Sequence, residues 1–302
     1  MLPAAPGGYL TGDATAYNGE WRSGGDSHAG SVRLNEEETE MGDLFSLEGK
    51  VSLVTGGNGG IGKGLADGFA MKGSAVVIAA RDVDKTAEAV ADIKKRFGVK
   101  ASGIAMDVAD PASIKTGIKK ALDEYGRIDV LANNAGINVR RMPQDYAVEE
   151  WDKIIDINIR GAFLCCQAVY PAMKKQGKGK IINTGSMTSL IGLGKGVPYG
   201  VSKMGMLSLT YSLALAWARD RIFVNCILPG WIDTALTRGA RKDFPGLGDF
   251  VEQRTPLGRW GEPDDFMGVA AFLASDASDF ITGEYIRVDG GFAQHGNTVS
   301  FT

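Results

Sequence analysis

From Lys50 onward, short apolar runs alternate with longer amphipathic segments. The apolar runs have the length of buried strands, and they predict strands over 51–55, 74–80, 101–107, 128–134, 180–186, 222–230 and 285–291. The amphipathic segments predict helices over 60–72, 84–97, 149–174, 198–218 and 262–274, and a further helix that begins at Asp110-Pro111. Strands that alternate with helices of this length form right-handed βαβ units. We therefore expect an α/β fold, doubly wound, with a seven-stranded parallel sheet and helices on both faces.

Residues 1–44 differ in composition from the rest of the chain. They are rich in Gly, Ala, Ser and Thr, show no periodicity and include the acidic run NEEETE. The segment has neither the charged start nor the apolar core of a signal peptide, so we expect a disordered tail. No linker-like stretch divides the remainder, and we expect a single domain over 45–302.

Charge and composition exclude several classes of function. The 33 basic and 36 acidic residues give a net charge of −3, which argues against a nucleic-acid partner. No apolar run approaches the roughly 18 residues that span a membrane. Three cysteines without framework spacing favour a reducing, cytoplasmic location. The only histidines are His28 and His295, outside the predicted core, so neither a metal site nor a Ser–His–Asp triad is expected.

The candidate chemistry lies in Ser186, Tyr199 and Lys203. Tyr199 and Lys203 are four residues apart, so on a helix both side chains leave the same face. A phenol is a poor base at its ordinary pKa of about 10, but a neighbouring ammonium favours the phenolate and lowers that pKa. The serine hydroxyl would hold the oxygen of an alcohol or ketone while the tyrosine moves the proton. These residue types therefore predict alcohol–carbonyl interconversion.

A glycine-rich turn follows the first predicted strand and opens a helix, over residues 55–62. Glycines let such a turn approach a pyrophosphate, whose charge the free N–H groups of the helix N-terminus stabilise. The position between strand and helix predicts a Rossmann dinucleotide site. The second strand ends at Ala80, where an acidic residue would bind the ribose of NAD, and Arg81 follows. We expect NADP to be preferred, although Asp82 keeps NAD open and Arg81 can simply be solvated.

Taken in order, the motifs resemble those of the short-chain dehydrogenase/reductase family over about residues 45–292. The matching elements are the glycine turn, Asn133-Asn134-Ala135-Gly136, Asn158, Ser186, Tyr199-x-x-x-Lys203 and Pro229-Gly230. The resemblance implies a general acid/base role for Tyr199 and an orienting role for Ser186. Lys203 would bind the nicotinamide ribose and lower the pKa of Tyr199. Asn158 would kink its helix and hold a water that relays protons.

The resemblance also implies a set of cofactor-binding residues around the dinucleotide. They are Gly56, Asn58, Gly60, Ile61, Gly62, Arg81, Asp107, Val108, Asn134, Ala135, Gly136, Tyr199, Lys203, Pro229, Gly230, Ile232 and Thr234. Some of these residues could instead have a structural role. Asp107 can be an ordinary turn residue, and the paired amides at 133 and 134 can be purely structural.

Within the family, several strings look like gluconate 5-dehydrogenases and related deoxy-sugar-acid dehydrogenases. They are Asn138-Val139-Arg140-Arg141, Ser186-Met187 and the segment 254–261. Arg140 or Arg141 would face a substrate carboxylate, Met187 would lie near the substrate, and residues 231–253 would form a lid. A sugar acid or polyol is the expected substrate, with reduction of a 3-oxoacyl thioester as the enzymatic alternative. A non-catalytic nucleotide sensor is the alternative of another class, and the resemblance implies a homotetramer.

Overall fold

The computed structural model of the protein describes residues 43–294. The predicted tail over 1–44 lies outside the described residues except for its last two, and so does the end of the chain from residue 295. Seven parallel strands form one sheet in the order β3-β2-β1-β4-β5-β6-β7. They are β1 (Val51–Thr55), β2 (Ala75–Ala80), β3 (Ala101–Ala105), β4 (Val130–Asn133), β5 (Gly179–Thr184), β6 (Ile222–Pro229) and β7 (Tyr285–Val288).

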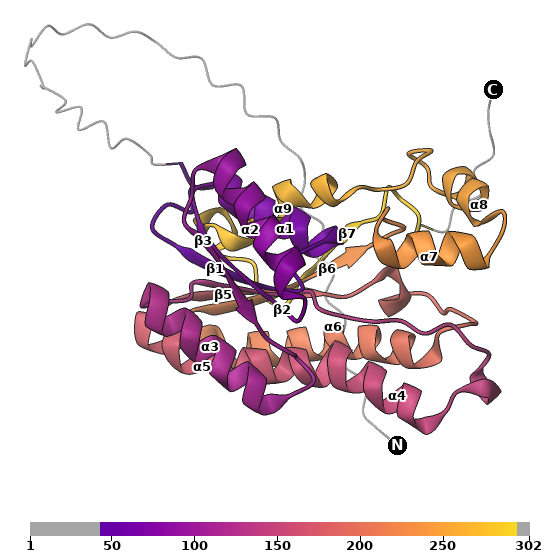
Figure 1. Ribbon diagram of the computed structural model, residues 1–302, viewed down its shortest axis with the longest axis horizontal. Coiled ribbons are helices and arrows are strands. Elements are labelled where there is room, and N and C mark those ends of the chain that lie inside the picture. The colour runs from indigo at the N-terminus through magenta and orange to yellow at the C-terminus, as the bar shows by residue number, and fades with distance from the viewer. Residues whose placement is uncertain (1–42, 295–302) are drawn as a thin grey trace, which may run out of the picture. The chain divides into compact units, whose positions relative to one another are not determined.

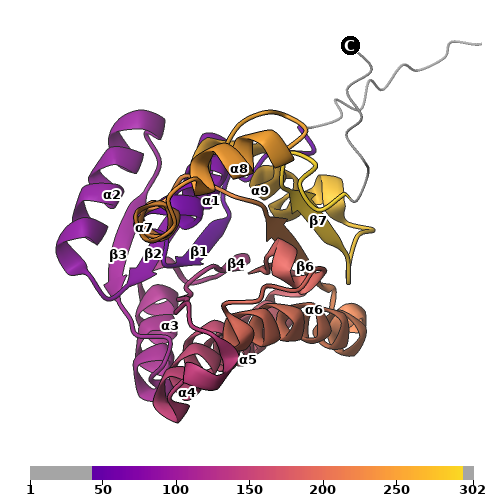
Figure 2. The ribbon, with the colours of Figure 1, turned by 90° about the vertical axis from the view of Figure 1, so that its right-hand side faces the viewer.

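Helices cover both faces of this sheet (Figure 2). One face carries α1 (Gly60–Met71), α2 (Val83–Phe97) and α9 (Met267–Ala274). The other carries α3 (Pro111–Tyr125), α5 (Gly161–Gln176) and α6 (Val197–Trp217), with α4 (Val148–Ile155) packed on α6. The predicted doubly wound fold with seven parallel strands is therefore confirmed.

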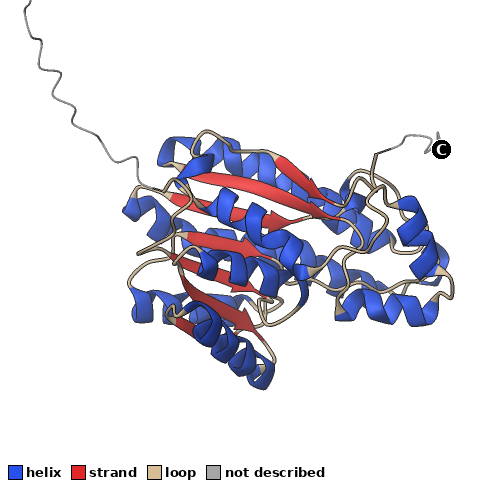
Figure 3. Cartoon of the chain, turned by 90° about the horizontal axis from the view of Figure 1, so that it is seen from above, coloured by secondary structure: helices blue, strands red, loops and turns tan. Residues whose placement is uncertain are grey.

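The strand order reverses at β1, which pairs with β2 on one side and β4 on the other. In open parallel sheets, ligands bind beyond the carboxyl ends of the strands at this reversal. Two short helices, α7 (Ala235–Asp243) and α8 (Leu247–Arg254), extend past those strand ends (Figures 1 and 3). They occupy the segment that was predicted to be a lid.

Alternation along the strands divides the apolar core into two layers. Successive residues of a strand point to opposite faces, so Leu53 packs in the layer beneath α3 and α5, and Val54 in the layer beneath α1 and α9. Phe69 and Phe266, both fully buried, are among the largest side chains of the second layer. Each such side chain contributes about 1.5–3 kcal/mol of transfer free energy, so both layers hold the sheet in place.

Two helix predictions need correction. The continuous helix expected over 149–174 is interrupted by a π-helical turn, Asp156–Arg160, between α4 and α5. Hydrophobic spacing does not report this turn, because it is held by the side chain of Asn158 and the backbone of Ile137, a contact between distant parts of the chain. The helix expected over 262–274 begins with a separate 3₁₀ turn, Pro263–Phe266. The predicted start at Asp110 is confirmed, since its carboxylate accepts a hydrogen bond from Ala112 N at 2.9 Å.

Within residues 43–294, no helix is long and apolar enough to cross a membrane. No group of His, Cys, Asp and Glu side chains in that range could hold a metal ion.

The close packing of α1 on the Pro263–Phe266 turn makes one glycine indispensable. A Cβ on Gly64 would lie 1.9 Å from the carbonyl oxygen of Pro263. We predict that Gly64→Ala lowers the free energy of unfolding by about 1–3 kcal/mol, as overpacking does. Gly268→Ala in α9 is the matched control, because a Cβ there meets nothing within 4 Å. It should stabilise the protein by up to about 1 kcal/mol through helix propensity. Equal melting temperatures of the two variants would contradict this packing.

Candidate active site

Two adjoining cavities lie at the carboxyl ends of the strands and share a wall of four residues, Gly56, Asn58, Ala135 and Gly136. The first is also lined by Gly59, Gly60, Ile61, Lys85, Asn134, Thr184, Gly185, Ser186, Tyr199, Lys203, Pro229, Gly230, Ile232, Thr234, Ala235, Leu236 and Thr237. The second is also lined by Ala79, Ala80, Arg81, Asp82, Met106, Asp107, Val108, Ile137 and Ile157. Together they form an elongated cleft that crosses the end of β1. Most of the predicted cofactor-binding residues therefore lie around one cleft.

The glycine turn between β1 and α1 has the shape that a pyrophosphate needs. Gly56 and Gly60 have φ angles of +64° and +53°, which side chains disfavour. The first turn of α1 carries no acidic side chain and its N-cap makes no side-chain hydrogen bond, so its N–H groups remain free for an anion. Gly62 does not line the cleft. A glycine at this position lets α1 pack against the turn, because a Cβ there would lie 2.3 Å from the carbonyl oxygen of Gly56.

Asn134 braces the same turn from β4. Its Nδ2 donates to the carbonyl oxygens of Gly56 at 3.2 Å and of Thr55 at 3.3 Å. Its backbone N–H and that of Ala135 donate to the Thr55 hydroxyl. The turn that faces the cleft is therefore tied to the neighbouring strand by side-chain and backbone hydrogen bonds.

One cation and two carboxylates lie at the end of β2. Arg81 is exposed, and its Nη1 lies 4.0 Å from Asp107 Oδ2. The Asp82 carboxylate accepts from Lys85 N at 3.0 Å and caps α2, so its Oδ1 is engaged by the protein itself. The Asp107 carboxylate likewise accepts from Ala109 N. A 2′-phosphate would meet a cation here, whereas the carboxylates already have backbone partners.

Sequence reasoning missed Lys85. Its Nζ lies 2.7 Å from the position that a Cβ on Gly59 would take, and it forms no ion pair within residues 43–294. The missing side chain at Gly59 therefore leaves room for an ammonium over the glycine turn. A signal was present, because Lys85 follows Arg81 by four residues. Its contact with Gly59, however, joins two segments 26 positions apart along the chain, and no spacing rule predicts it.

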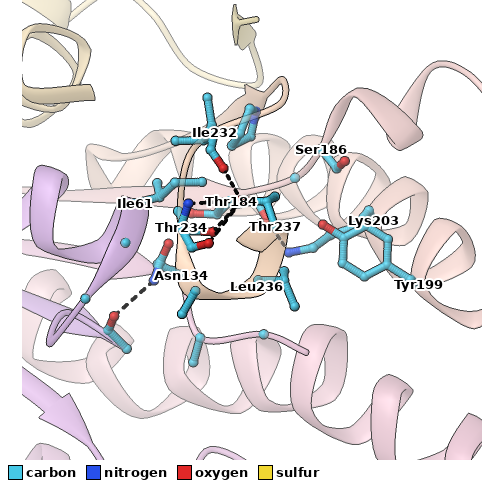
Figure 4. Close-up of a pocket in the computed structure, with 18 of the residues that line it drawn as sticks. Ile61, Asn134, Thr184, Ser186, Tyr199, Lys203, Ile232, Thr234, Leu236 and Thr237 are labelled. Atoms are coloured by element: carbon cyan, nitrogen blue, oxygen red, sulfur yellow. Dashed lines mark hydrogen bonds between the residues drawn. The ribbon is translucent and has the colours of Figure 1, made fainter. Parts of the chain in front are cut away.

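Ser186, Tyr199 and Lys203 line the deep end of the first cavity (Figure 4). Ser186 follows β5, and its hydroxyl accepts from Thr188 N at 3.1 Å as the cap of a short 3₁₀ turn, Met187–Ser189. Tyr199 and Lys203 leave the same face of α6. Lys203 is buried, and its Nζ donates to the carbonyl oxygen of Thr184 at 2.7 Å.

Asn158 lies in the π-helical turn and is fully buried. Its Oδ1 accepts from Ile137 N at 2.8 Å, and its Nδ2 donates to Ile137 O at 2.9 Å and to the Ser202 hydroxyl at 3.1 Å. The Ser202 hydroxyl donates to the carbonyl oxygen of Tyr199 at 2.7 Å. Asn158 therefore does not line the cleft but joins the loop after β4 to α6. The proton-relay water stays a prediction.

The three candidate substrate residues lie in different surroundings. Arg140 is half-buried in the loop after β4, and within residues 43–294 it makes no ion pair or side-chain hydrogen bond. Arg141, in contrast, is exposed and pairs with Glu150 at 2.7 Å. Met187 is buried against Phe292 and lines neither cavity. Arg140 also lines neither cavity, but it is near enough to Tyr199 for its charge to lower the pKa of that residue.

Known proteins share both the sequence and the fold of this chain. Residues 56–293 match the family model described as "Enoyl-(Acyl carrier protein) reductase". The 2-dehydro-3-deoxy-D-gluconate 5-dehydrogenase of Escherichia coli (strain K12) is 39% identical over 251 residues, which cover 82% of this chain and 97% of that protein. The chain belongs to the short-chain dehydrogenase/reductase family. Like other members, it is an NAD(P)-dependent oxidoreductase that acts on CH–OH groups.

Other relatives include two gluconate 5-dehydrogenases and a tropinone reductase homolog. The gluconate 5-dehydrogenase of Gluconobacter oxydans (strain 621H) is 36% identical over 251 residues, covering 82% of this chain and 96% of that protein. A crystal structure of a gluconate 5-dehydrogenase from Burkholderia cenocepacia J2315, in complex with NADP and tartrate, superposes with a TM-score of 0.80. It is 37% identical and covers 84% of this chain and 99% of that chain. A tropinone reductase homolog from Arabidopsis thaliana is 38% identical, so the family resemblance alone leaves the substrate open.

The predicted effect of Lys203 on the pKa of Tyr199 stays a prediction, because it is not seen in the cofactor-free protein. Tyr199 is half-buried, and burial raises its pKa above the ordinary value, while a hydrogen bond with Ser186 and the charge of Arg140 lower it in part. Lys203 is not among the groups that lower it, because its ammonium is turned to Thr184 O and lies 5.7 Å from the centre of the tyrosine ring. Burial in turn lowers the pKa of Lys203 to about 8.

The lowered pKa of Lys203 predicts a stability effect with a definite sign. Between pH 8 and its unfolded pKa, the unfolded chain binds more protons at this lysine, so the free energy of unfolding rises with pH in that window. Below pH 8 the folded protein carries the full cost of a buried charge, on the order of 3 kcal/mol. We predict that Lys203→Met raises the melting temperature of the cofactor-free protein at pH 7, and that this gain shrinks by pH 10.

The matched control is Lys115→Met, since Lys115 is exposed on α3. Its effect on the melting temperature should not depend on pH over the same range. If Lys203→Met destabilises the protein equally at pH 7 and pH 10, the buried charge carries no cost and this interpretation is wrong.

Proposed function

We propose that this enzyme interconverts the secondary alcohol of a sugar acid and the corresponding ketone, with NADP as its preferred cofactor. The observation that carries the proposal is the half-buried Arg140, which forms no ion pair within residues 43–294 and whose charge lowers the pKa of Tyr199. An arginine without a carboxylate partner is free to bind a substrate carboxylate through charge-assisted hydrogen bonds. A substrate bound in this way would lie within the range over which the charge of Arg140 acts on Tyr199.

The chain's own residues divide the chemistry among them. The Ser186 hydroxyl would donate to the substrate oxygen and fix its position. Tyr199 would give its proton to that oxygen in ketone reduction and take the proton in alcohol oxidation. Lys203 would turn from Thr184 O toward the nicotinamide ribose hydroxyls. The nicotinamide, when bound, supplies or accepts the hydride.

Burial of the tyrosine hydroxyl has a consequence for the two directions. A raised pKa keeps Tyr199 protonated in the cofactor-free enzyme, which suits its role as the acid in reduction. Oxidation needs the phenolate, so its rate should rise with pH until the tyrosine has titrated. A hydrogen bond from Ser186 and the charge of Arg140 both favour the phenolate, and each therefore supports oxidation.

The preference for NADP is supported by the charges at the end of β2. Arg81 and Lys85 place two cations near the ribose position, and Asp82 caps α2. The Burkholderia cenocepacia structure contains NADP. A planar guanidinium suits a phosphate because it can donate two parallel hydrogen bonds.

The exposed surface of α6 supports a homotetramer. Val201, Met204, Tyr211 and Leu215 lie on one side of the helix, and between 40% and 85% of their surface is exposed. An apolar stripe of this kind commonly becomes buried against another chain. We further propose a cytoplasmic location, since Cys165, Cys166 and Cys226 are all free thiols, as is typical of a reducing compartment.

The direct test follows nicotinamide absorbance with NADP and NAD against gluconate, its deoxy and keto relatives, neutral polyols and a 3-oxoacyl thioester. We expect turnover of a sugar acid, faster with NADP. Tyr199→Phe should reduce kcat at least about 100-fold, because it removes the acid/base, while NADP binding measured by calorimetry persists. Turnover of the thioester alone would favour the acyl-thioester reductase instead. Tight NADP binding without any turnover would favour a nucleotide sensor.

The role of Arg140 has its own test. Arg140→Gln should raise KM for a sugar acid by about 10- to 100-fold, because a charge-assisted hydrogen bond contributes roughly 1.5–3 kcal/mol. KM for a neutral polyol should change little, and each variant is measured at its own optimal pH. Arg141→Gln is the matched control, since Arg141 already pairs with Glu150 on the surface. Equal KM changes for the acid and the polyol would remove Arg140 from carboxylate binding.

A further inference from the structure

Ser189 ends the 3₁₀ turn that begins after Ser186. It is 4% exposed and lines neither cavity, so it does not touch the cleft. Its hydroxyl nevertheless makes contacts with two parts of the active site. A hydroxyl can donate once and accept twice, and both uses occur here.

On one side, the Ser189 hydroxyl accepts from the backbone N–H of Ser186 at 3.3 Å. The Ser186 hydroxyl, in return, receives the N–H of Thr188, so the two serines cap the short turn reciprocally. This arrangement determines the direction in which the Ser186 side chain leaves the backbone.

On the other side, the Ser189 hydroxyl donates to the carbonyl oxygen of Lys203 in α6 at 2.6 Å. That carbonyl belongs to the residue one helical turn after Tyr199. A single buried hydroxyl therefore joins the backbone of Ser186 to the backbone of Lys203, and β5 and α6 are held at one separation at the depth of the cavity.

The space that this hydroxyl occupies is also prepared by its neighbours. A Cβ on Gly185 would lie 3.2 Å from Ser189 Oγ and 2.4 Å from a side-chain carbon of Leu228. Because residue 185, directly before Ser186, is a glycine, the 3₁₀ turn can lie close to α6.

We propose that Ser189 is a positioning residue, which sets the Ser186 hydroxyl against the Tyr199 hydroxyl by tying the backbone of Ser186 to α6 at Lys203, one helical turn after Tyr199. The proposal rests on the proposed function, in which these two hydroxyls share the substrate oxygen. Misplacement of a reacting group by about 1 Å can cost up to roughly 100-fold in rate. Loss of the Ser189 hydroxyl should therefore weaken catalysis without weakening cofactor binding.

The loss should also leave a signature that a purely structural residue would not. Ser186 lowers the pKa of Tyr199 through a hydrogen bond. When the turn is no longer tied to α6, that bond lengthens and the pKa of Tyr199 rises. Alcohol oxidation needs the phenolate, so its pH profile should move to higher pH.

The test compares Ser189→Ala, Ser186→Ala and the double variant. We expect Ser189→Ala to lower kcat for oxidation at pH 7 by about tenfold, to move the midpoint of the kcat profile to higher pH, and to leave the Kd for NADP within about twofold. In the Ser186→Ala background, Ser189→Ala should have no further effect on kcat, since it acts through Ser186.

The matched control is Ser52→Ala. Ser52 is also fully buried and hydrogen-bonded, to Ser74 at 2.8 Å, but it lies near the start of β1, away from the cleft. It should lower the melting temperature without moving the pH profile. If Ser189→Ala does not fold, Ser189→Cys fills the site with a somewhat larger side chain that is only a weak donor, and it should move the profile in the same direction. An unchanged pH midpoint, or an equal loss of kcat in both backgrounds, would overturn the proposal.

A second readout needs no substrate. The phenolate absorbance of each cofactor-free protein is titrated with pH, and the curve of its Tyr199→Phe version is subtracted. The difference should titrate at higher pH in Ser189→Ala than in the parent protein. If the enzyme turns over none of the tested alcohols, the proposed function fails, and this titration still decides the role of Ser189.

Discussion

The amide of Asn158 is the contact on which the geometry of the active site depends. It is completely buried, and it uses both of its polar ends on the backbone of Ile137 and on Ser202. Ile137 belongs to the loop that carries Arg140, and Ser202 belongs to the turn of α6 that carries Tyr199. In a regular α-helix, the side chain of Asn158 would not reach Ile137 and Ser202 together. The π-helical turn distorts the helix locally and makes these contacts possible. The substrate side and the proton-transfer side of the pocket are thereby held in register.

A second constraint is that the reacting groups are enclosed by protein. Burial raises the pKa of Tyr199 and lowers that of Lys203 to about 8, so burial shifts both equilibria toward the neutral forms, although Lys203 still carries its charge below pH 8. The fold tolerates this because its two apolar layers and its continuous seven-stranded sheet hold the site in place. Strong opposing shifts on an acid and a base in one cleft are typical of catalytic sites. Such pKa shifts lower the stability of the folded protein, which is the common trade-off between activity and stability at a catalytic site.

The fold followed from the sequence because its signals are local. Buried strands, the Asp110 cap and the glycine turn each depend on a few adjacent residues, and all agree with one parallel sheet. The placement of Ser186, Tyr199 and Lys203 around one cavity could also be anticipated, since the ends of parallel strands meet at one edge. The contacts that sequence reasoning missed are those between distant segments. The ammonium of Lys85 over Gly59 and the hydrogen bonds of Asn158 to Ile137 both depend on tertiary packing, although the family resemblance did imply a kink at Asn158 itself. Met187 was expected near the substrate, but packing against Phe292 turns it into the core.

The central claim is that one cleft brings a 2′-phosphorylated dinucleotide, a substrate carboxylate and the Ser186–Tyr199 pair together. A crystal structure of the Tyr199→Phe variant with NADP and the sugar acid that the enzyme turns over tests this most directly. The account predicts the 2′-phosphate beside Arg81, the carboxylate on Arg140, and the reacting hydroxyl within hydrogen-bond distance of Ser186. A carboxylate bound away from Arg140, with the reacting carbon far from Ser186, would contradict it.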